Sequence, residues 1–405
     1  MSKPKITVII PTRERCDVLE KSIQSVIAQD YDNLDIIVSD NYSSDSTEDV
    51  VRATHDRRVK YINTGRRVSM SHNWEFALSH VTDGWVTVIG DDDGLLPASL
   101  SKVAEIAKST DTYAIRSKVC SYSWPSLADQ GFGHLSVPLT SGCEVRDSKE
   151  WLSKVMNGRA NYPELPMLYN GGFIRMSVLN EIKIKTGAFY RSLTPDVYSA
   201  LSIASAVDSY IYSNEPLAIN GASKHSTGTS SYSKEENDEA SPMKIFCSEE
   251  NLPFHEDLPL CGGDIKYPPS IHVLVYESYL QSKELRKEAM AHTRSQQLEI
   301  ILATSGNHDA EITEWGGVFA KAHGLNYGGI QSKVAKRRFL LTLMNFPRRA
   351  VGAINTYNVI GRSDLPIRDV YEASVTAAAI RNVMPSRSKI ARQVIARLLD
   401  KRDRV

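Results

Sequence analysis

The sequence predicts an α/β fold built on a doubly wound, mostly parallel sheet. Short β-branched runs alternate with segments of helical apolar spacing through roughly the first 105 residues. This alternation is typical of parallel strands joined by crossover helices. The runs also lack the apolar–polar alternation of a strand with one wet face, so we expect both faces of the sheet to be covered.

The predicted elements follow one another in order. Residues 6–10 form a strand stopped by Pro11, and the apolar spacing that follows predicts a helix with Asp17 as its N-cap. A second N-cap is expected at Asp147. The first half contains predicted strands at residues 6–10, 35–40, 59–62, 85–89 and 112–120. Helices are predicted at residues 17–27, 72–80 and 100–107, with a short one through residues 50–51.

Three adjacent carboxylates, Asp91, Asp92 and Asp93, follow the run at residues 85–89. Such carboxylates repel one another and would lack partners inside a core, so we expect them at the exposed C-terminal edge of the sheet. Open α/β sheets bind ligands at this edge. A divalent cation bridging a phosphate would relieve the repulsion. The alternative is a solvated acidic turn.

Composition bounds the class of protein. The chain has 405 residues, which predicts two to three domains, and a formal net charge of zero, which gives no global field for nucleic acid. Five scattered cysteines without a C-x-x-C pair argue against a disulfide framework or a zinc site and for a reducing compartment. No apolar stretch reaches the length of a spanning helix and no signal peptide is seen, so we expect a cytoplasmic protein.

Four sequence elements, taken together, resemble family 2 glycosyltransferases with the GT-A fold. They are residues 8–15, the strand and loop at residues 35–45, Asn63 and Gly65 followed by Asn73, and the acidic motif at residues 90–97. The resemblance implies a GT-A catalytic domain at residues 1–230, with a mixed Rossmann-like sheet. It does not cover the rest of the chain, where helical apolar spacing predicts a mainly helical extension at residues 231–405. It also implies inverting transfer of a sugar from a nucleoside-diphosphate sugar to an acceptor hydroxyl, in bacterial O-antigen, capsule or exopolysaccharide synthesis.

The donor would be held at the strand ends. Asp40, which ends the second strand, is placed to accept from a base N–H or a ribose hydroxyl, and Thr12, which ends the first, could contact the base. Arg67 could reach the base or the diphosphate. A turn-forming Asp40 and a solvated Arg67 are the alternatives.

The resemblance also assigns the acidic motif. It implies that Asp92 holds the ribose, Asp93 holds Mg²⁺ or Mn²⁺, and Asp91 supports the loop. Gly90 stands where the family usually has its first Asp, so the division among the three carboxylates stays open. His225, in a Gly- and Ser-rich loop, is a candidate further metal ligand; the alternative is a solvated histidine.

Two later motifs complete the predicted site. Gly171, in a glycine pair beside apolar residues, suggests close approach of the backbone to the sugar. Asp196, at a Thr-Pro-Asp helix start, stands where the family keeps its acidic base, which takes the proton from the acceptor hydroxyl. The alternative for Asp196 is a carboxylate that interacts only with the helix dipole.

The last third combines basic and apolar residues. Residues 333–349 and 389–401 mix Lys and Arg with compact apolar groups, a composition that suits a helix on an anionic membrane surface. The alternative is an ordinary helix packed on the catalytic domain. We therefore expect a nucleotide-sugar donor, a saccharide or lipid-linked saccharide acceptor, possible peripheral contact with the inner membrane, and no nucleic acid.

Two other functions are weighed against transfer. A nucleotidyltransferase that makes an activated sugar would need a Gly-rich, basic phosphate loop after the first strand, and the segment from Pro11 to Glu14 offers none. A non-catalytic nucleotide-binding scaffold would have no need of the intact acidic motif and Asp196.

Overall fold

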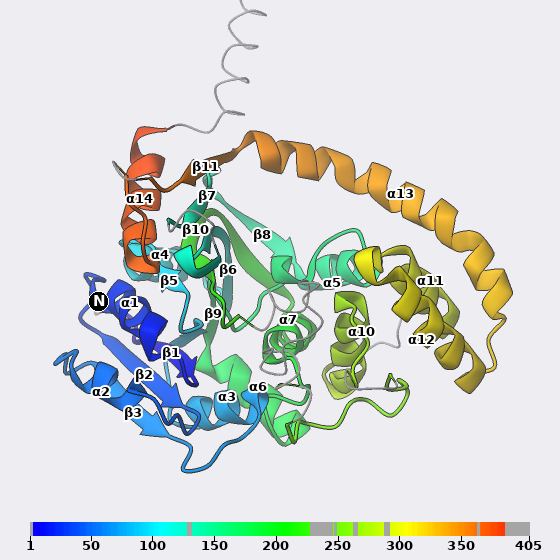
Figure 1. The fold of residues 1–405 in the computed structure, drawn as a ribbon, viewed down its shortest axis with the longest axis horizontal. Helices are drawn as coiled ribbons and strands as arrows, with labels where there is room; N and C mark the ends of the chain where they lie inside the picture. The colour runs from blue at the N-terminus through cyan, green and yellow to red at the C-terminus, as the bar shows by residue number, and fades with distance from the viewer. Residues whose placement is uncertain are drawn as a thin grey trace, which may run out of the picture.

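The computed structural model describes residues 3–127, 132–226, 246, 249–261, 266–286, 292–362 and 365–384. Within these residues, one 11-stranded sheet runs through the molecule in the order β11-β7-β6-β9-β4-β1-β2-β3, and β5, β8 and β10 join it off this path. Helices cover both faces of the sheet, and a separate group of helices lies beyond α7 (Figure 1). The expected mixed α/β sheet with a helical C-terminal region is confirmed.

The N-terminal strands form the predicted parallel unit. Strand β1 pairs in parallel with β2 on one side and β4 on the other, and β2 pairs in parallel with β3. The β-branched side chains of β1, β2 and β4 are buried on both faces, as a doubly covered sheet requires, whereas the edge strand β3 is partly exposed. The elements of this unit are β1 (Ile6–Thr12), α1 (Cys16–Ile27), β2 (Leu34–Asp40), α2 (Thr47–Arg52), β3 (Val59–Asn63), α3 (Met70–Ser79), β4 (Trp85–Val88) and α4 (Ser99–Ser109).

The predicted N-cap of α1 is wrong. The helix begins at Cys16, and the carbonyl of Arg15 accepts the backbone N–H groups of Val18 and Leu19 at 3.2 and 3.1 Å. Asp17 therefore lies inside the first turn, where its carboxylate still favours the positive end of the helix dipole. The second expected cap is confirmed, because the Asp147 side chain accepts from the backbone N–H of Glu150.

The rest of the sheet is antiparallel or mixed. Strand β9 pairs antiparallel with both β4 and β6, and the long β10 pairs with β6, β5 and β8, with a register shift between Ser213 and Ala218. This mixed half places β10 beside the acidic motif. Its elements are β5 (Gly94–Leu95), β6 (Ala114–Ser123), η1 (Pro125–Leu127), β7 (His134–Pro138), β8 (Cys143–Asp147), α5 (Ser148–Met156), η2 (Tyr162–Glu164), β9 (Gly172–Arg175), α6 (Met176–Thr186), α7 (Pro195–Ala206) and β10 (Ser209–Ala222).

A helical layer follows, and then the chain returns to the sheet. Helix α7 shares one apolar core with the later helices, including Leu201, Leu298 and Phe319. Beyond α13, β11 pairs antiparallel with β7 and α14 packs on α1. The later elements are α10 (Ile271–Gln281), η3 (Lys283–Leu285), α11 (Arg294–Ala303), η4 (Gly306–His308), α12 (Asp309–Ala322), α13 (Tyr327–Ile354), β11 (Thr356–Ile360) and α14 (Val370–Val383).

Two expectations fall on residues that the structure does not describe, and two others can be compared only over the described part of the chain. The domain boundary near residue 230 and the apolar–basic segment at residues 389–401 both lie outside them. Across the described chain, no helix combines the length and apolarity that crossing a bilayer requires. The four described cysteines, Cys16, Cys120, Cys143 and Cys261, form no disulfide.

Candidate active site

The three carboxylates form the turn between β4 and β5, at the C-terminal end of the parallel strands. The expectation that they are exposed and lack partners is wrong. Asp91, Asp92 and Asp93 expose only 2, 5 and 0% of their surface. They tolerate burial because other segments bring hydrogen-bond donors and one cation to the turn, which offsets the loss of water.

The Asp93 carboxylate accepts three hydrogen bonds from other parts of the protein. Oδ1 accepts from the backbone N–H of Gly221, while Oδ2 accepts from the backbone N–H of Gly90 and from the Tyr169 hydroxyl, each at 2.7 Å. Burial, together with the nearby charge of Asp92, raises the pKa of Asp93 to about 7 despite these hydrogen bonds. A Cβ at Gly90 would lie 2.9 Å from Asp93 Oδ2, which is a local reason for glycine there.

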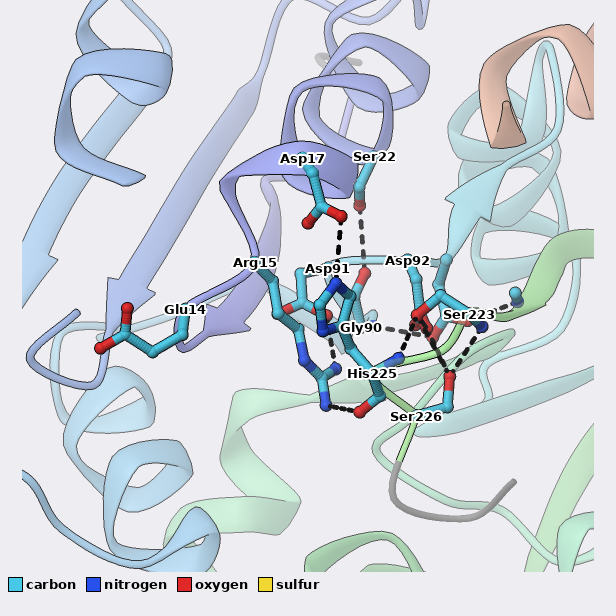
Figure 2. Close-up of polar contacts among 12 residues, drawn as sticks. Glu14, Arg15, Asp17, Ser22, Gly90, Asp91, Asp92, Ser223, His225 and Ser226 are labelled. Atoms are coloured by element: carbon cyan, nitrogen blue, oxygen red, sulfur yellow. Dashed lines mark hydrogen bonds and ion pairs between the residues drawn. The ribbon is translucent and has the colours of Figure 1, made fainter. Parts of the chain in front are cut away.

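Asp92 faces the segment that follows β10. Its Oδ2 accepts from the hydroxyls of Ser223 and Ser226 at 2.8 and 2.6 Å, and its carbonyl accepts from the Trp124 indole at 3.0 Å. Figure 2 shows the two serines converging on this carboxylate. Among the described residues, no hydrogen bond reaches Asp92 Oδ1. Asp92 Oδ1 is thus left for a ligand.

Asp91 is paired with a cation from the loop after β1. Arg15 Nη1 donates to Asp91 Oδ1 at 2.8 Å, and Arg15 Nη2 donates to the carbonyl of His225 (Figure 2). Burial raises the pKa of Asp91, and the Arg15 charge opposes that rise. Burial lowers the pKa of Arg15, but the charges of Asp91 and Asp92 outweigh it, so that the net shift is upward. Arg15 is therefore a permanent positive charge inside an acidic site.

His225 has its backbone at the acidic turn and its ring elsewhere. Its Nε2 lies 3.0 Å from Asp17 Oδ2 at the start of α1 (Figure 2). A metal contact through Nε2 would require this pair to separate. Lys224 beside it makes only a backbone contact to Ser126 among the described residues. The role of His225 as a metal ligand remains a hypothesis.

Thr12 and Asp40 are neighbours across the ends of β1 and β2, as expected of parallel strands. All of Asp40's lone-pair directions are used: Oδ1 accepts from the N–H and hydroxyl of Ser43, and Oδ2 accepts from Tyr61 and Asn63. A contact between Asp40 and a nucleotide would replace one of these bonds. Thr12 differs, because its buried hydroxyl has no hydrogen-bond partner in the part of the chain that the structure describes.

Arg67 and Gly171 lie at the two sides of this edge. Arg67 is half-exposed and pairs with Glu14 at 2.8 Å, so it is held above the strand ends rather than buried. Gly171 has φ +86°, and an added Cβ would lie 2.7 Å from Ser117 Oγ. Its neighbour Asn170 donates to Asn220 of β10, which ties the glycine turn to the strand that carries the Asp93 donor Gly221.

Asp196 is the second residue of α7 and accepts a 2.7 Å hydrogen bond from the Tyr162 hydroxyl. Burial raises the pKa of Asp196, while the Tyr162 bond lowers it. Tyr169, which donates to Asp93, packs against the apolar cluster that contains Val197, the residue after Asp196. Burial raises the pKa of Tyr169, and the charges of Asp93, Asp92 and Asp196 raise it further. Asp196 therefore lies near enough to the acidic turn for the two predicted motifs to be considered together.

The contacts of the acidic turn determine which of its oxygens could bind a metal ion. Within the described residues, no group of three or more His, Cys, Asp or Glu side chains could hold a metal. Mg²⁺ in nucleotide sites, however, commonly uses one or two carboxylates together with substrate phosphates and water. Asp92 Oδ1, which accepts no hydrogen bond among the described residues, meets that smaller requirement. Asp93 already accepts three hydrogen bonds and keeps one lone pair, on Oδ1. The donor set therefore suits a metal that arrives with a diphosphate.

Sequence reasoning missed four contributors to the site: Arg15, Tyr162, Tyr169 and the serine pair Ser223 and Ser226. Arg15 and Tyr169 stand within motifs that the sequence did single out, at residues 8–15 and 168–175. Nothing local marks them as partners of the acidic turn, because they reach it from 76 residues away on either side. A requirement that buried carboxylates have partners would have prompted the search.

The N-terminal part of the chain is similar to a known protein family. Residues 7–158 match the family model described as Glycosyl transferase family 2. This segment is similar to family 2 glycosyltransferases. The match covers β1, the acidic turn and the strands between them, and it ends before Tyr169 and Asp196.

Curated family relatives match in the same region. The GalNAc(5)-diNAcBac-PP-undecaprenol beta-1,3-glucosyltransferase of Campylobacter jejuni is 40% identical over 114 residues, 27% of this chain and 36% of that protein. Succinoglycan biosynthesis protein ExoO of Rhizobium meliloti is 26% identical, over 26% of this chain and 30% of its own. The chain thus aligns with about a third of the length of these relatives.

One solved structure similar to this chain is S. aureus TarS 1-349 in complex with UDP-GlcNAc. It is 14% identical, covers 85% of this chain and 92% of its own, and has a TM-score of 0.46.

Proposed function

We propose that this protein is an inverting glycosyltransferase that moves a sugar from a nucleoside-diphosphate sugar to an acceptor hydroxyl. One observation carries the proposal: Tyr169 donates to Asp93 of the acidic turn and packs against the apolar cluster that contains Val197, the residue next to Asp196. A transferase needs a site for the leaving diphosphate and a base for the acceptor within one pocket. The proposed donor and base sites lie within residues 1–230.

For the donor, we propose that the diphosphate and its metal bind at the acidic turn. Mg²⁺ or Mn²⁺ would neutralise the charge of the leaving diphosphate. Asp92, through Oδ1, is the favoured contact, with Asp91 beside it held by Arg15. Asp93 is assigned to holding the turn, since three protein donors already occupy its oxygens. Thr12, Asp40 and Arg67 remain the proposed contacts of the nucleoside side, and Gly171 that of the sugar.

For the acceptor, we propose that Asp196 takes the proton from the attacking hydroxyl. The upward pKa shift caused by burial makes Asp196 a stronger base than an ordinary carboxylate, which suits general-base work nearer neutral pH. Tyr162 limits that shift by donating to Oδ2 and orients the carboxylate. Attack from the Asp196 side with departure of the diphosphate at the acidic turn would invert the anomeric centre.

The acceptor class is proposed from the relatives. Their names include an undecaprenol-linked glucosyltransferase, a succinoglycan biosynthesis protein and a colanic acid glycosyl transferase. We propose a hexosyl transfer in bacterial surface-polysaccharide synthesis, onto a saccharide or a lipid-linked saccharide. Such an acceptor would place the enzyme at the cytoplasmic face of the inner membrane.

Calorimetry tests the donor half of this proposal. Titration with UDP and with GDP, each with and without Mn²⁺, should show binding of at least one diphosphate that Mn²⁺ strengthens. If neither UDP nor GDP binds, the transferase function is refuted. A nucleotidyltransferase would instead consume a nucleoside triphosphate and a sugar phosphate with release of pyrophosphate, so the same protein is also assayed for pyrophosphate.

A further inference from the structure

Helix α13 has one face toward the protein and an opposite face toward solvent. The inward face is set by Ile330 and Leu341, which are buried against α11 and the Gly158 turn. Asn345 donates to the Gly158 carbonyl at 3.2 Å on the same side. The helix runs along the outer edge of the molecule from α12 to β11, and no described element lies outside it (Figure 1).

The outward face is apolar. Phe339, Leu343, Phe346 and Ile354 recur at helical spacing on the side opposite Leu341. Phe339 and Phe346 expose 64 and 66% of their surface, and Leu343 and Ile354 more than half. A solvent-facing helix surface is ordinarily polar, whereas here the apolar side chains form a continuous stripe. The stripe is wide, because Leu340, Met344 and Val351 are also exposed beside it.

The charge of α13 is entirely positive. Residues 327–354 contain six Lys and Arg residues and no Asp or Glu. Three of the cations are paired with the protein: Arg337 with Glu299, Arg338 with Asp309 and Arg348 with Glu164. The other three, Lys333, Lys336 and Arg349, are exposed and have no ion pair among the described residues. The apolar stripe is therefore bordered by uncompensated positive charge.

We propose that the outward face of α13 is a docking surface for a lipid bilayer that carries anionic headgroups. Apolar side chains on one face with Lys and Arg beside them are the pattern of a helix that lies in the membrane interface. Anionic headgroups complement Lys333, Lys336 and Arg349. A second copy of this chain is a poorer partner, because two such faces would bring like charges together with no carboxylate on either helix. With 28 residues, the helix could lie along about 42 Å of surface.

The docking helix is connected to the proposed base. Arg348 on its inward side pairs with Glu164, the last residue of η2, and the first residue of η2 is Tyr162, which donates to Asp196. A bilayer bound to the outward face of α13 would thus be connected, through Arg348, to η2, the element that also positions Asp196. That this arrangement presents a lipid-linked acceptor to Asp196 rests on the proposed function; the docking itself does not.

Vesicle flotation of the full chain tests the docking. The protein should float with vesicles of phosphatidylcholine containing roughly one third phosphatidylglycerol and remain behind with pure phosphatidylcholine, and added salt should weaken the binding. The double variant Leu343→Glu and Phe346→Glu should reduce the floated fraction about tenfold. Ile184→Glu is the matched control, because Ile184 is an exposed apolar residue on α6, and it should float like the parent.

Three outcomes would overturn the docking: no flotation with anionic vesicles, equal flotation of parent and double variant, or light scattering that shows a dimer which the double variant dissociates. The last result would make a second copy the occupant. Thermal unfolding at the parent temperature shows that the variant is folded. UDP binding measured on the same samples separates the two proposals. The double variant should still bind UDP. A parent protein that does not bind UDP would refute the transferase function and leave the docking proposal untouched.

Discussion

The hydroxyl of Tyr169 donates a 2.7 Å hydrogen bond to Oδ2 of Asp93. This bond joins the segment before β9 to the acidic turn after β4 and completes the set of three donors around the Asp93 carboxylate. The Tyr169 ring also packs against Trp74 of α3, with ring centroids 5.4 Å apart. Tyr169 therefore fixes the acidic turn to α3 as well as to the segment before β9.

Tyr169→Phe removes that donor and keeps the ring. We expect the free energy of unfolding to fall by about 1.5 kcal/mol, the usual worth of a hydrogen bond to a charged group. Urea denaturation measures the change. Tyr42→Phe serves as the control, because Tyr42 is exposed, and it should leave stability unchanged. Equal effects of the two substitutions would mean that the bond to Asp93 contributes nothing.

Asp196→Asn tests the base. Loss of the carboxylate should lower kcat by about a factor of 10³ and leave the affinity for the nucleoside diphosphate unchanged, because Asp196 acts on the acceptor. Single-turnover transfer and calorimetry on the same preparation give the two numbers. Asp208→Asn, at an exposed carboxylate just after α7, should behave like the parent. Turnover retained by Asp196→Asn would remove this residue as the base.

Tyr162→Phe should move the pH profile of transfer to higher pH. Activity requires ionised Asp196, so the rate rises with pH through the Asp196 pKa. The Tyr162 hydrogen bond lowers that pKa, and its loss leaves burial to raise it further. The ascending limb of kcat against pH is the measurement. A limb that stays in place, or that moves toward acid, contradicts the proposed role of Asp196.

Arg15→Gln should destabilise the protein by about 3 kcal/mol at neutral pH, because it leaves Asp91 buried without its cation. Without Arg15 the folded-state pKa of Asp91 rises further above its unfolded value, so Asp91 binds a proton more tightly when folded. The loss of stability is then smallest at acid pH and grows as pH rises. Chemical denaturation at several pH values measures it.

A matched arginine provides the comparison. Arg67 also pairs with a carboxylate, but at an exposed position, so Arg67→Gln should cost less than about 1 kcal/mol. Losses of equal size and equal pH dependence in the two variants would mean that burial of the Arg15 pair has no energetic consequence.

The metal assignment predicts different consequences for neighbouring carboxylates. Asp92→Asn should abolish the strengthening of UDP binding by Mn²⁺, and chelation of the metal should have the same effect on the parent. Asp93→Asn should chiefly lower stability, because an amide N–H₂ would face a donor now bonded to Asp93. Titrations of both variants with UDP and Mn²⁺ decide between them. If Mn²⁺ still strengthens UDP binding in Asp92→Asn but not in Asp93→Asn, Asp93 and not Asp92 is the metal ligand.

Much of the N-terminal fold could be predicted because its signals are local. The β-branched runs at β1, β2, β3 and β4 stand between segments of helical spacing, and that alternation is sufficient for a parallel sheet. The parallel register also places Thr12 beside Asp40. The short strand β11 was not predicted, although its residues are as strand-forming as those of β3, because its pairing with β7 joins segments more than 200 residues apart.

The sequence by itself determined the family 2 motifs, the position of the acidic turn at a strand end, and the helix start that carries Asp196. Only the tertiary structure decided that the three carboxylates are buried and which oxygens are already used. The reason is physical: repulsion among adjacent carboxylates is visible in the sequence, whereas its compensation by Arg15, Tyr169 and the serines after β10 depends on long-range contacts. Those contacts leave Asp92 Oδ1 available to a ligand.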